Sequence, residues 1–207
     1  MERKEISVIE IFRSVKDGQI SIDKAWHEFG DAIKQYKTRN SNESLALLNL
    51  YIRYCGYLHQ YGYWKDECQY LDQTYQVLMS QQGILSHEQY ENRCETIISK
   101  RANVAINLGD YATAIKMLKE LLYRYPSKNV YKNMYINALR SRLNKIFRPL
   151  TIVFCLICLI LVVLRHVFDI KIFPYWIFVV VWGAWLLTCV AFLLIPTYAK
   201  YFVFKNN

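Results

Sequence analysis

Residues 149–164 read PLTIVFCLICLILVVL, and residues 173–196 read FPYWIFVVVWGAWLLTCVAFLLIP. Neither stretch contains Asp, Glu, Lys or Arg. At 1.5 Å per residue the first would span about 24 Å as a helix and the second about 36 Å, against a hydrocarbon core of about 30 Å. Val167 and Phe168 add apolar length to the first stretch. The sequence therefore predicts two transmembrane helices, over about 149–167 and 173–196.

The connection between the two predicted spans, residues 165–172, is so short that they must be antiparallel neighbours. We therefore expect a hairpin over 148–198, preceded by a cytosolic domain, 1–147, and followed by a short cytosolic tail, 199–207. Lys and Arg outnumber acids on both outer flanks, so the positive-inside rule predicts an integral membrane protein with both termini in the cytoplasm. The charged N-terminal residues do not resemble a signal peptide. A bacterial inner membrane is the default location.

Polar and aromatic residues mark the expected membrane interfaces. Those assigned to an interface are Arg148, Arg165, Tyr175, Trp176, Tyr198 and Lys200. Trp182 and Trp185 would lie nearer the middle of the membrane, beside the small residues Gly183 and Ala184. Small residues permit close approach of helices. The second span is therefore expected to pack against the first, or against another copy in a homo-oligomer formed through the hairpin.

The net charge of +9 at first favours nucleic-acid binding. However, residues 1–128 carry 17 Lys and Arg against 16 Asp and Glu, whereas residues 129–207 carry 9 against 1. A nucleic-acid-binding domain concentrates its basic surface on the folded unit. Here the excess flanks the apolar stretches, where anionic lipid attracts it. The sequence therefore predicts a lipid bilayer as partner and no nucleic acid.

The residues before the membrane show helical periodicity throughout. The expected helices are 6–15, 22–36 capped by Ser21, 43–61 capped by Ser41, 64–80, one opened by the capping box Ser86–Gln89 and running to about 107, 111–123, and a seventh opened by Pro126-Ser127. Asp17-Gly18, Gly62-Tyr63 and Gly109-Asp110 supply turns between them. The predicted fold class is all-α.

One window, residues 95–128, contains Leu108-Gly109-Asp110-Tyr111, Ala114-Ile115, Leu118, Leu121-Leu122 and Pro126. It resembles the tetratricopeptide repeat, whose second half reads G-D-Y-x-x-A-I…P at this spacing. A degenerate copy over 48–81 has Gly62 and Trp64 in register but Glu67 or Cys68 in place of the alanine. Residues 129–147 would form a third half-repeat that continues into the membrane. The resemblance implies an antiparallel helical repeat domain; a plain helical bundle is the alternative.

In tetratricopeptide proteins the first helices of successive repeats line a concave face that holds a partner. Carried onto this chain, the resemblance implies partner-binding positions at Ser99, Lys100, Asn103, Asn107, Asn133, Asn137 and Arg140. The basic carboxylate clamp of some family members is missing, since Ile52 and Gly56 occupy the corresponding places. These amides could equally serve only to keep a helix face wet.

Catalytic and ligand motifs are not found. The sequence contains no Gly-rich phosphate loop, G-x-S-x-G or H-E-x-x-H, and its four histidines are far apart. Cys155 and Cys158 form a C-x-x-C string inside an apolar run, where small apolar packing is the better explanation. We therefore expect no enzyme activity, no catalytic residues, no metal and no cofactor.

Tyrosine is unusually frequent, with 17 residues, six of them between Tyr51 and Tyr70. Packing between helices would use most of them, and a protein-binding surface could use some. The sequence thus predicts a membrane-anchored, non-enzymatic protein-interaction module, a scaffold or adaptor whose protein partner is unknown. The alternative is a small membrane effector or immunity protein, in bacterial defence or toxin neutralisation, whose hairpin oligomerises or binds a membrane partner.

Overall fold

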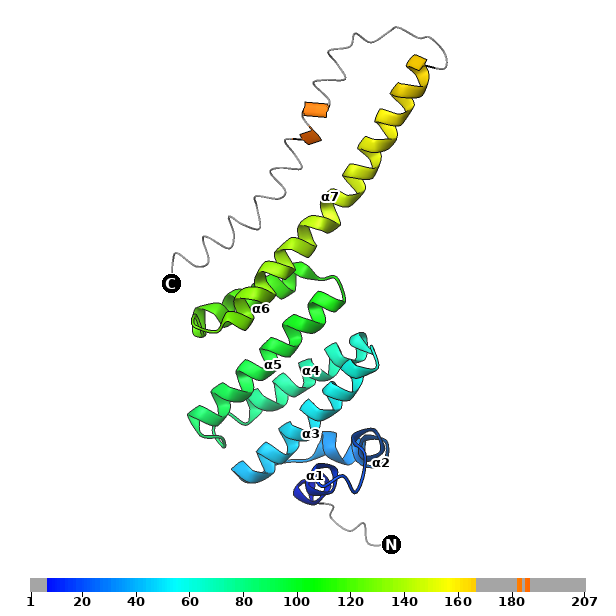
Figure 1. The fold of residues 1–207 in the computed structure, drawn as a ribbon. Coiled ribbons are helices and arrows are strands. Elements are labelled where there is room, and N and C mark those ends of the chain that lie inside the picture. The colour runs from blue at the N-terminus through cyan, green and yellow to red at the C-terminus, as the bar shows by residue number, and fades with distance from the viewer. Residues whose placement is uncertain (1–6, 167–181, 184, 187–207) are drawn as a thin grey trace. The chain divides into compact units, whose positions relative to one another are not determined.

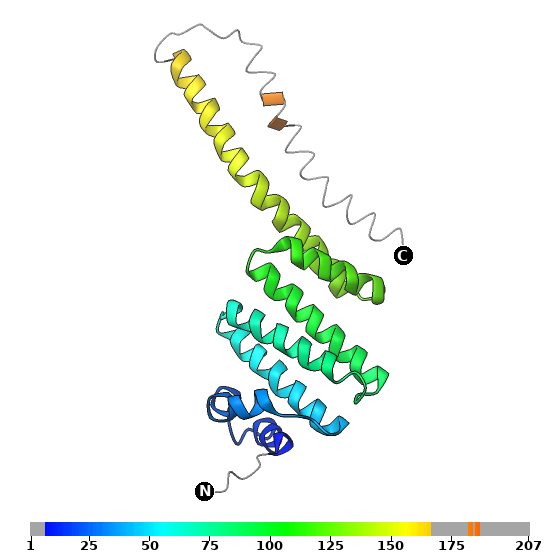
Figure 2. The same cartoon turned by 180° about the vertical axis from the view of Figure 1, so that it is seen from behind.

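The computed structural model describes residues 7–166, 182, 183, 185 and 186. These residues form seven α-helices and no strand, which confirms the all-α prediction (Figures 1 and 2). The chain divides into two compact units, residues 1–121 and 122–207, and the division falls inside α6.

The first unit is built around three consecutive helices. These are α3 (Ser41–Gln60), α4 (Trp64–Ser80) and α5 (His87–Asn107). Helix α4 packs between α3 and α5, while α1 (Val8–Lys16) and α2 (Ile22–Gln35) pack on α3 (Figure 1). The core of fully buried apolar side chains includes Ile33, Leu48, Leu50, Leu71, Leu78 and Ile97. The unit therefore extends by adding one antiparallel helix after another.

The turns after α3 and α5 have the same geometry. Gly62 and Gly109 both have φ of +73°, which costs an L side chain energy but glycine none. After α3, the Gly62 N–H donates to the His59 carbonyl (3.1 Å) and the Tyr63 N–H to the Leu58 carbonyl (2.9 Å). After α5, the N–H groups of Gly109 and Asp110 donate to the carbonyls of Ile106 and Ala105 (3.0 and 2.9 Å). Both turns are Schellman motifs, 47 residues apart.

The capping predictions are confirmed in part. Ser86 and Gln89 form the expected capping box of α5, with Ser86 Oγ accepting from the Gln89 N–H at 3.2 Å. The predicted cap at Ser41 is wrong, because Asn40 holds that position and its Oδ1 accepts from the Glu43 N–H at 3.0 Å. Ser21 occupies the N-cap position of α2, but its side chain makes no capping hydrogen bond.

Helix α6 (Tyr111–Arg124) begins and ends near the predicted residues and buries Ala114, Leu118 and Leu121. The seventh helix begins later than predicted. Pro126 lies in a turn in which the Lys128 N–H donates to the Tyr125 carbonyl at 3.2 Å, a position that suits a fixed φ. Helix α7 therefore starts at Asn129.

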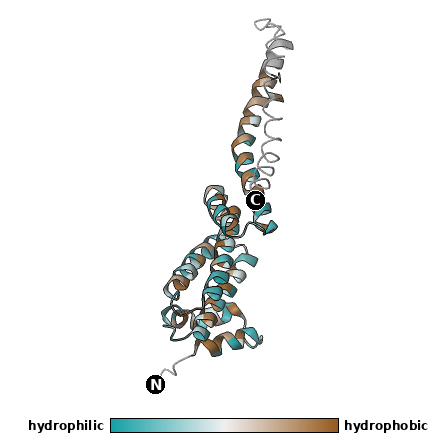
Figure 3. Ribbon diagram, turned by 90° about the vertical axis from the view of Figure 1, so that its left-hand side faces the viewer, coloured by the Kyte–Doolittle hydropathy of each residue, from teal (hydrophilic) through white to brown (hydrophobic). Residues whose placement is uncertain are grey.

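Helix α7 (Asn129–His166) continues without interruption through Pro149 into the apolar stretch. It is long and apolar enough to cross a membrane, and none of its most apolar window is buried. From Asn144 to Ile160 only Phe147, Phe154 and Cys158 are half-buried, and the other side chains are exposed. Figure 3 shows the change from polar to apolar residues along this helix. An apolar surface of this extent is typical of a membrane or partner contact rather than of a surface in water.

The predicted second span and the tail lie outside the described residues, apart from Trp182, Gly183, Trp185 and Leu186. The same holds for the predicted interface residues Tyr175, Trp176, Tyr198 and Lys200. Arg148 is exposed on α7, and Arg165 belongs to its last turn. The repeat resemblance, the hairpin and the boundary at residue 147 stay predictions.

Candidate functional site

Helix α5 is the most enclosed helix segment of the first unit. Every residue from 93 to 107 is buried or half-buried. Its fully buried side includes Cys94, Ile97, Ile98, Val104 and Ala105. Its other side is polar, and the side chains on it are half-buried rather than fully exposed.

The predicted partner-binding residues of α5 fall on this polar side. Ser99, Asn103 and Asn107 are spaced four residues apart, which places them on one side of a helix, and all three are half-buried. Lys100 is half-buried beside them. The structure therefore brings four of the predicted residues together in a row about 12 Å long.

A hydrogen bond to a buried carboxyl joins α3 to α4 near this row. His59, in the last turn of α3, and Glu67, in the first turn of α4, are joined by a 2.8 Å hydrogen bond between Nδ1 and Oε2. The Glu67 side chain is 1% exposed and that of His59 is 39% exposed. The Schellman turn at Gly62 sets the angle at which α4 returns along α3. This return brings His59 and Glu67, eight residues apart in the sequence, into contact.

Lys100, beside the polar row, lies close enough to Glu67 to affect its pKa. Burial raises the pKa of the Glu67 carboxyl, and the hydrogen bond and charge of His59 and the charge of Lys100 oppose that rise. The thiol of Cys55 lies in the same region, and burial raises its pKa to about 12. This thiol is therefore protonated at neutral pH and unreactive as a nucleophile.

The contact of α4 with α5 is fixed from another direction. Arg101 forms an ion pair with Asp72 at 2.5 Å, and its guanidinium lies 5.1 Å from the centre of the Tyr75 ring. The carboxylate and the aromatic face already hold the arginine side chain in one orientation. Burial therefore costs it little further conformational freedom. These contacts hold the register of α5 and so the position of the polar row.

Comparisons with protein-family models, with curated proteins and with solved structures each find nothing similar.

The three predicted residues of α7 form a separate row in the second unit. Asn133, Asn137 and Arg140 lie on the same side of the helix over about two turns, and all three are exposed. Unlike the α5 residues, they form an open polar surface.

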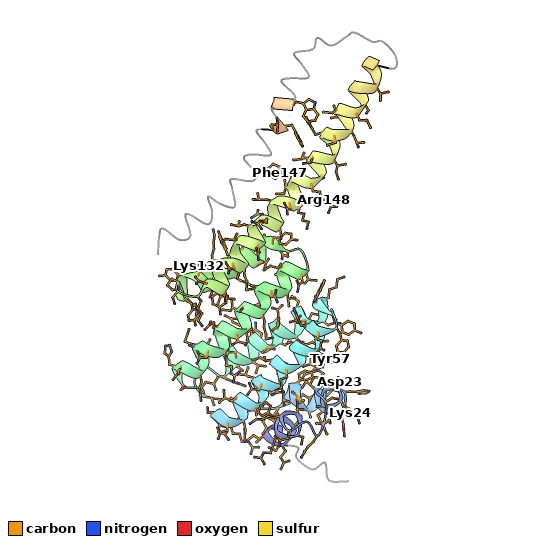
Figure 4. The ribbon with its side chains drawn as sticks, in the orientation of Figure 1. Asp23, Lys24, Tyr57, Lys132, Phe147 and Arg148 are labelled. Carbon is orange, nitrogen blue, oxygen red and sulfur yellow. The ribbon has the colours of Figure 1, made fainter. Side chains whose placement is uncertain are left out.

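A second surface feature is a chain of aromatic rings that begins in the core. Trp26 stacks on Tyr54 with ring centres 4.3 Å apart, and Tyr57 and Tyr61 follow along α3 at 6.1 and 4.8 Å. Tyr61 is 60% exposed and Tyr63, the next ring at 6.4 Å, is 53% exposed. Asp23 lies close enough to affect the pKa of Tyr57, and Figure 4 shows the two near each other. This chain of rings thus contains both tyrosines that pack between helices and tyrosines that lie at the surface, as expected from the sequence.

His59 and Glu67 were not predicted as site residues. The available signal was Glu67 itself, an acid where the repeat pattern calls for alanine. Buried carboxyls with a histidine partner and a raised pKa occur often in functional sites. Among the described residues no group of His, Cys, Asp and Glu could hold a metal ion. The arrangement offers hydrogen-bond donors and acceptors at fixed spacing with a charged group at one side, which suits binding.

Proposed function

We propose that this chain is a membrane-anchored, non-enzymatic interaction module that holds an extended segment of a partner protein along the polar side of α5. The observation that carries the proposal is the half-buried row Ser99, Asn103 and Asn107 on a helix with no fully exposed residue between 93 and 107.

Carboxamide side chains suit an extended peptide because each can donate to a backbone carbonyl and accept from a backbone N–H. Two such groups one helical turn apart, Asn103 and Asn107, lie about 6 Å from each other along the axis. That separation is close to the distance between alternate residues of an extended chain. On a half-buried helix side these bonds compete less with water than they would on a fully exposed surface.

The His59–Glu67 pair and Lys100 would give the polar row selectivity. A charged group of a partner placed against them must match their charge, because an unmatched charge in a partly buried site is costly. Affinity would come from the amides and selectivity from this charged edge.

The anchoring part of the proposal is supported by α7, which is long and apolar enough to cross a membrane. We infer that the second apolar stretch returns alongside α7 as an antiparallel span. In support, the Trp185 ring stacks on Phe154 of α7 with centres 6.0 Å apart and planes 5° apart. Trp182 in turn contacts Trp185 edge to face at 5.6 Å. Tethering would raise the effective concentration of the module for other membrane-bound partners.

The test is affinity capture with the tagged full-length chain from mildly solubilised host membranes. We compare the wild type with Asn103→Lys, which puts a long cation into the polar row, and with Asn42→Lys, the same change at an exposed position of α3. Proteins bound by the polar row of α5 should be retained by the Asn42→Lys chain and reduced at least tenfold by Asn103→Lys. Equal capture by both variants would rule out the polar row as the binding site. Circular dichroism checks that both variants are folded.

A further inference from the structure

The segment of α7 that enters the apolar stretch is strongly basic. Its cations are Arg140, Arg142, Lys145 and Arg148, and no Asp or Glu occurs between Glu120 and Asp169. All four cationic side chains are exposed. The segment therefore carries a positive charge that the neighbouring sequence does not offset.

The uninterrupted helix gives these charges a regular spacing. Arg142, Lys145 and Arg148 are three residues apart, so each lies about 4.5 Å further along the axis, and all three fall within about one third of the circumference. Figure 4 shows Arg148 and Phe147 near the middle of α7, and the apolar stretch begins at the next residue, Pro149. We call Arg142, Lys145 and Arg148 the basic stem.

We propose that the basic stem binds the phosphate headgroups of anionic phospholipids. This inference rests on the membrane anchoring proposed above. With Arg148 at the hydrocarbon boundary, Lys145 lies about 4.5 Å and Arg142 about 9 Å outside it. The headgroup layer of one leaflet is about 5–8 Å thick, so the stem crosses it with a cation at each level.

The side chains suit this ligand. Guanidinium groups form bidentate hydrogen bonds with phosphate oxygens, and a lysine adds a point charge. A zwitterionic lipid carries its own cation, which lowers its net attraction to the stem, whereas phosphatidylglycerol does not. A protein or nucleic-acid ligand at this depth would have to displace lipid headgroups, so lipid is the occupant that the position favours.

Native mass spectrometry of the detergent-solubilised full-length chain tests the inference. The protein is titrated separately with phosphatidylglycerol and phosphatidylcholine of the same acyl chains. Each of the three cations should contribute about fivefold in affinity. Phosphatidylglycerol should therefore bind on the order of 100-fold more tightly than phosphatidylcholine. The variant Arg142→Gln/Lys145→Gln/Arg148→Gln should lose most of this preference.

The matched control removes three charges elsewhere. Lys24, Lys116 and Lys119 are exposed in the first unit, and their joint replacement by Gln lowers the net charge equally. The control should keep the lipid preference. Inorganic phosphate at millimolar concentration should not displace the lipid, because it has no acyl chain to lie along the apolar stretch.

Two outcomes would overturn the inference: equal binding of both lipids by the wild type, or equal loss of preference in the stem variant and the control. Flotation of the same protein with liposomes and resistance to alkaline carbonate report membrane insertion independently. Insertion without headgroup preference would therefore contradict the basic stem alone, and failure to insert would contradict the anchoring on which it rests.

Discussion

Glu67 shows how much one side chain depends on its surroundings. Its carboxyl is almost fully enclosed and bonded to His59, and Cys55 and Lys100 lie close enough to affect its titration or be affected by it. A carboxylate removed from water loses hydration that one hydrogen bond restores only in part. Burial therefore raises the pKa of Glu67 above its ordinary value, and the hydrogen bond and charge of His59 and the charge of Lys100 oppose this rise only in part.

The change Glu67→Gln should alter stability in a pH-dependent way. The pKa of Glu67 is raised above its ordinary value of 4.5, so the folded state holds this proton more tightly than the unfolded state. Its contribution to the free energy of unfolding is greatest below about pH 4.5 and is lost as pH rises through the raised pKa. The amide cannot ionise, so Glu67→Gln should gain stability relative to the wild type between pH 4 and pH 8.

Thermal unfolding of the detergent-solubilised chain at pH 4, 6 and 8 measures this difference. Glu88→Gln, at an exposed acid in the first turn of α5, is the control and should show no such trend. A Glu67→Gln difference that stays constant or shrinks as pH rises would show that the carboxyl is ionised without penalty.

Where elements join, glycine determines the direction of the returning helix. Gly62 has φ of +73° and an open space where a Cβ would stand, so a substitution there meets no neighbour and only backbone strain. Gly83 also has open space but no positive φ. The two positions therefore differ in backbone strain but not in steric overlap.

Gly62→Ala should lower the free energy of unfolding by about 1 kcal/mol, because alanine resists a left-handed backbone. Gly83→Ala should be neutral or stabilising by a few tenths of a kcal/mol, because it only restricts the unfolded chain. Thermal unfolding of the two variants side by side gives both values. Equal effects would mean that the turn after α3 does not need its positive φ.

The proposed pairing of the two apolar stretches requires one particular face of α7, the one that carries Phe154, to meet the second stretch. In a chain whose native cysteines are replaced by serine, Phe154→Cys and Trp185→Cys should form a disulfide on mild oxidation in bilayers, since these two rings stack. Leu156→Cys with Trp185→Cys is the control, because Leu156 is exposed and lies about 200° around the helix from Phe154. A faster reaction of the Leu156 pair would contradict the proposed hairpin.

For the molecule as a whole, the decisive property is the contrast between its two units. The first unit buries its apolar side chains in its own core, whereas α7 of the second exposes Leu150, Ile152 and Leu156. In water such a helix would associate with any apolar surface available. In lipid the same side chains need no further partner.

The full-length chain should therefore stay in the membrane fraction after alkaline carbonate treatment. Tags at either terminus should be protected from protease added outside intact cells and cleaved once the membrane is opened, because the positive flanks favour the cytoplasmic side. Chain that is freely soluble without detergent would contradict the anchor, and tags cleaved from outside would contradict the predicted topology.

Much of the fold follows from local sequence. The helices are predicted to within a few residues by three local features. These are the helical periodicity of apolar residues, the glycines at 18, 62 and 109, and the Ser86–Gln89 capping box. These features act between residues at most four or five positions apart, so their effect needs no knowledge of the fold. The apolar stretch of α7 depends on composition alone. The tetratricopeptide resemblance stays a prediction.

The contacts that give the molecule its candidate sites depend on which helix faces meet. The pairing of His59 with Glu67, the stacking of Trp26 on Tyr54 and that of Phe154 on Trp185 join residues on different helices or stretches. The sequence alone does not show whether these side chains pack against each other or point to solvent. Only packing removes Glu67 from water and encloses the polar row of α5, because burial is decided by the sum of long-range contacts rather than by neighbours along the chain.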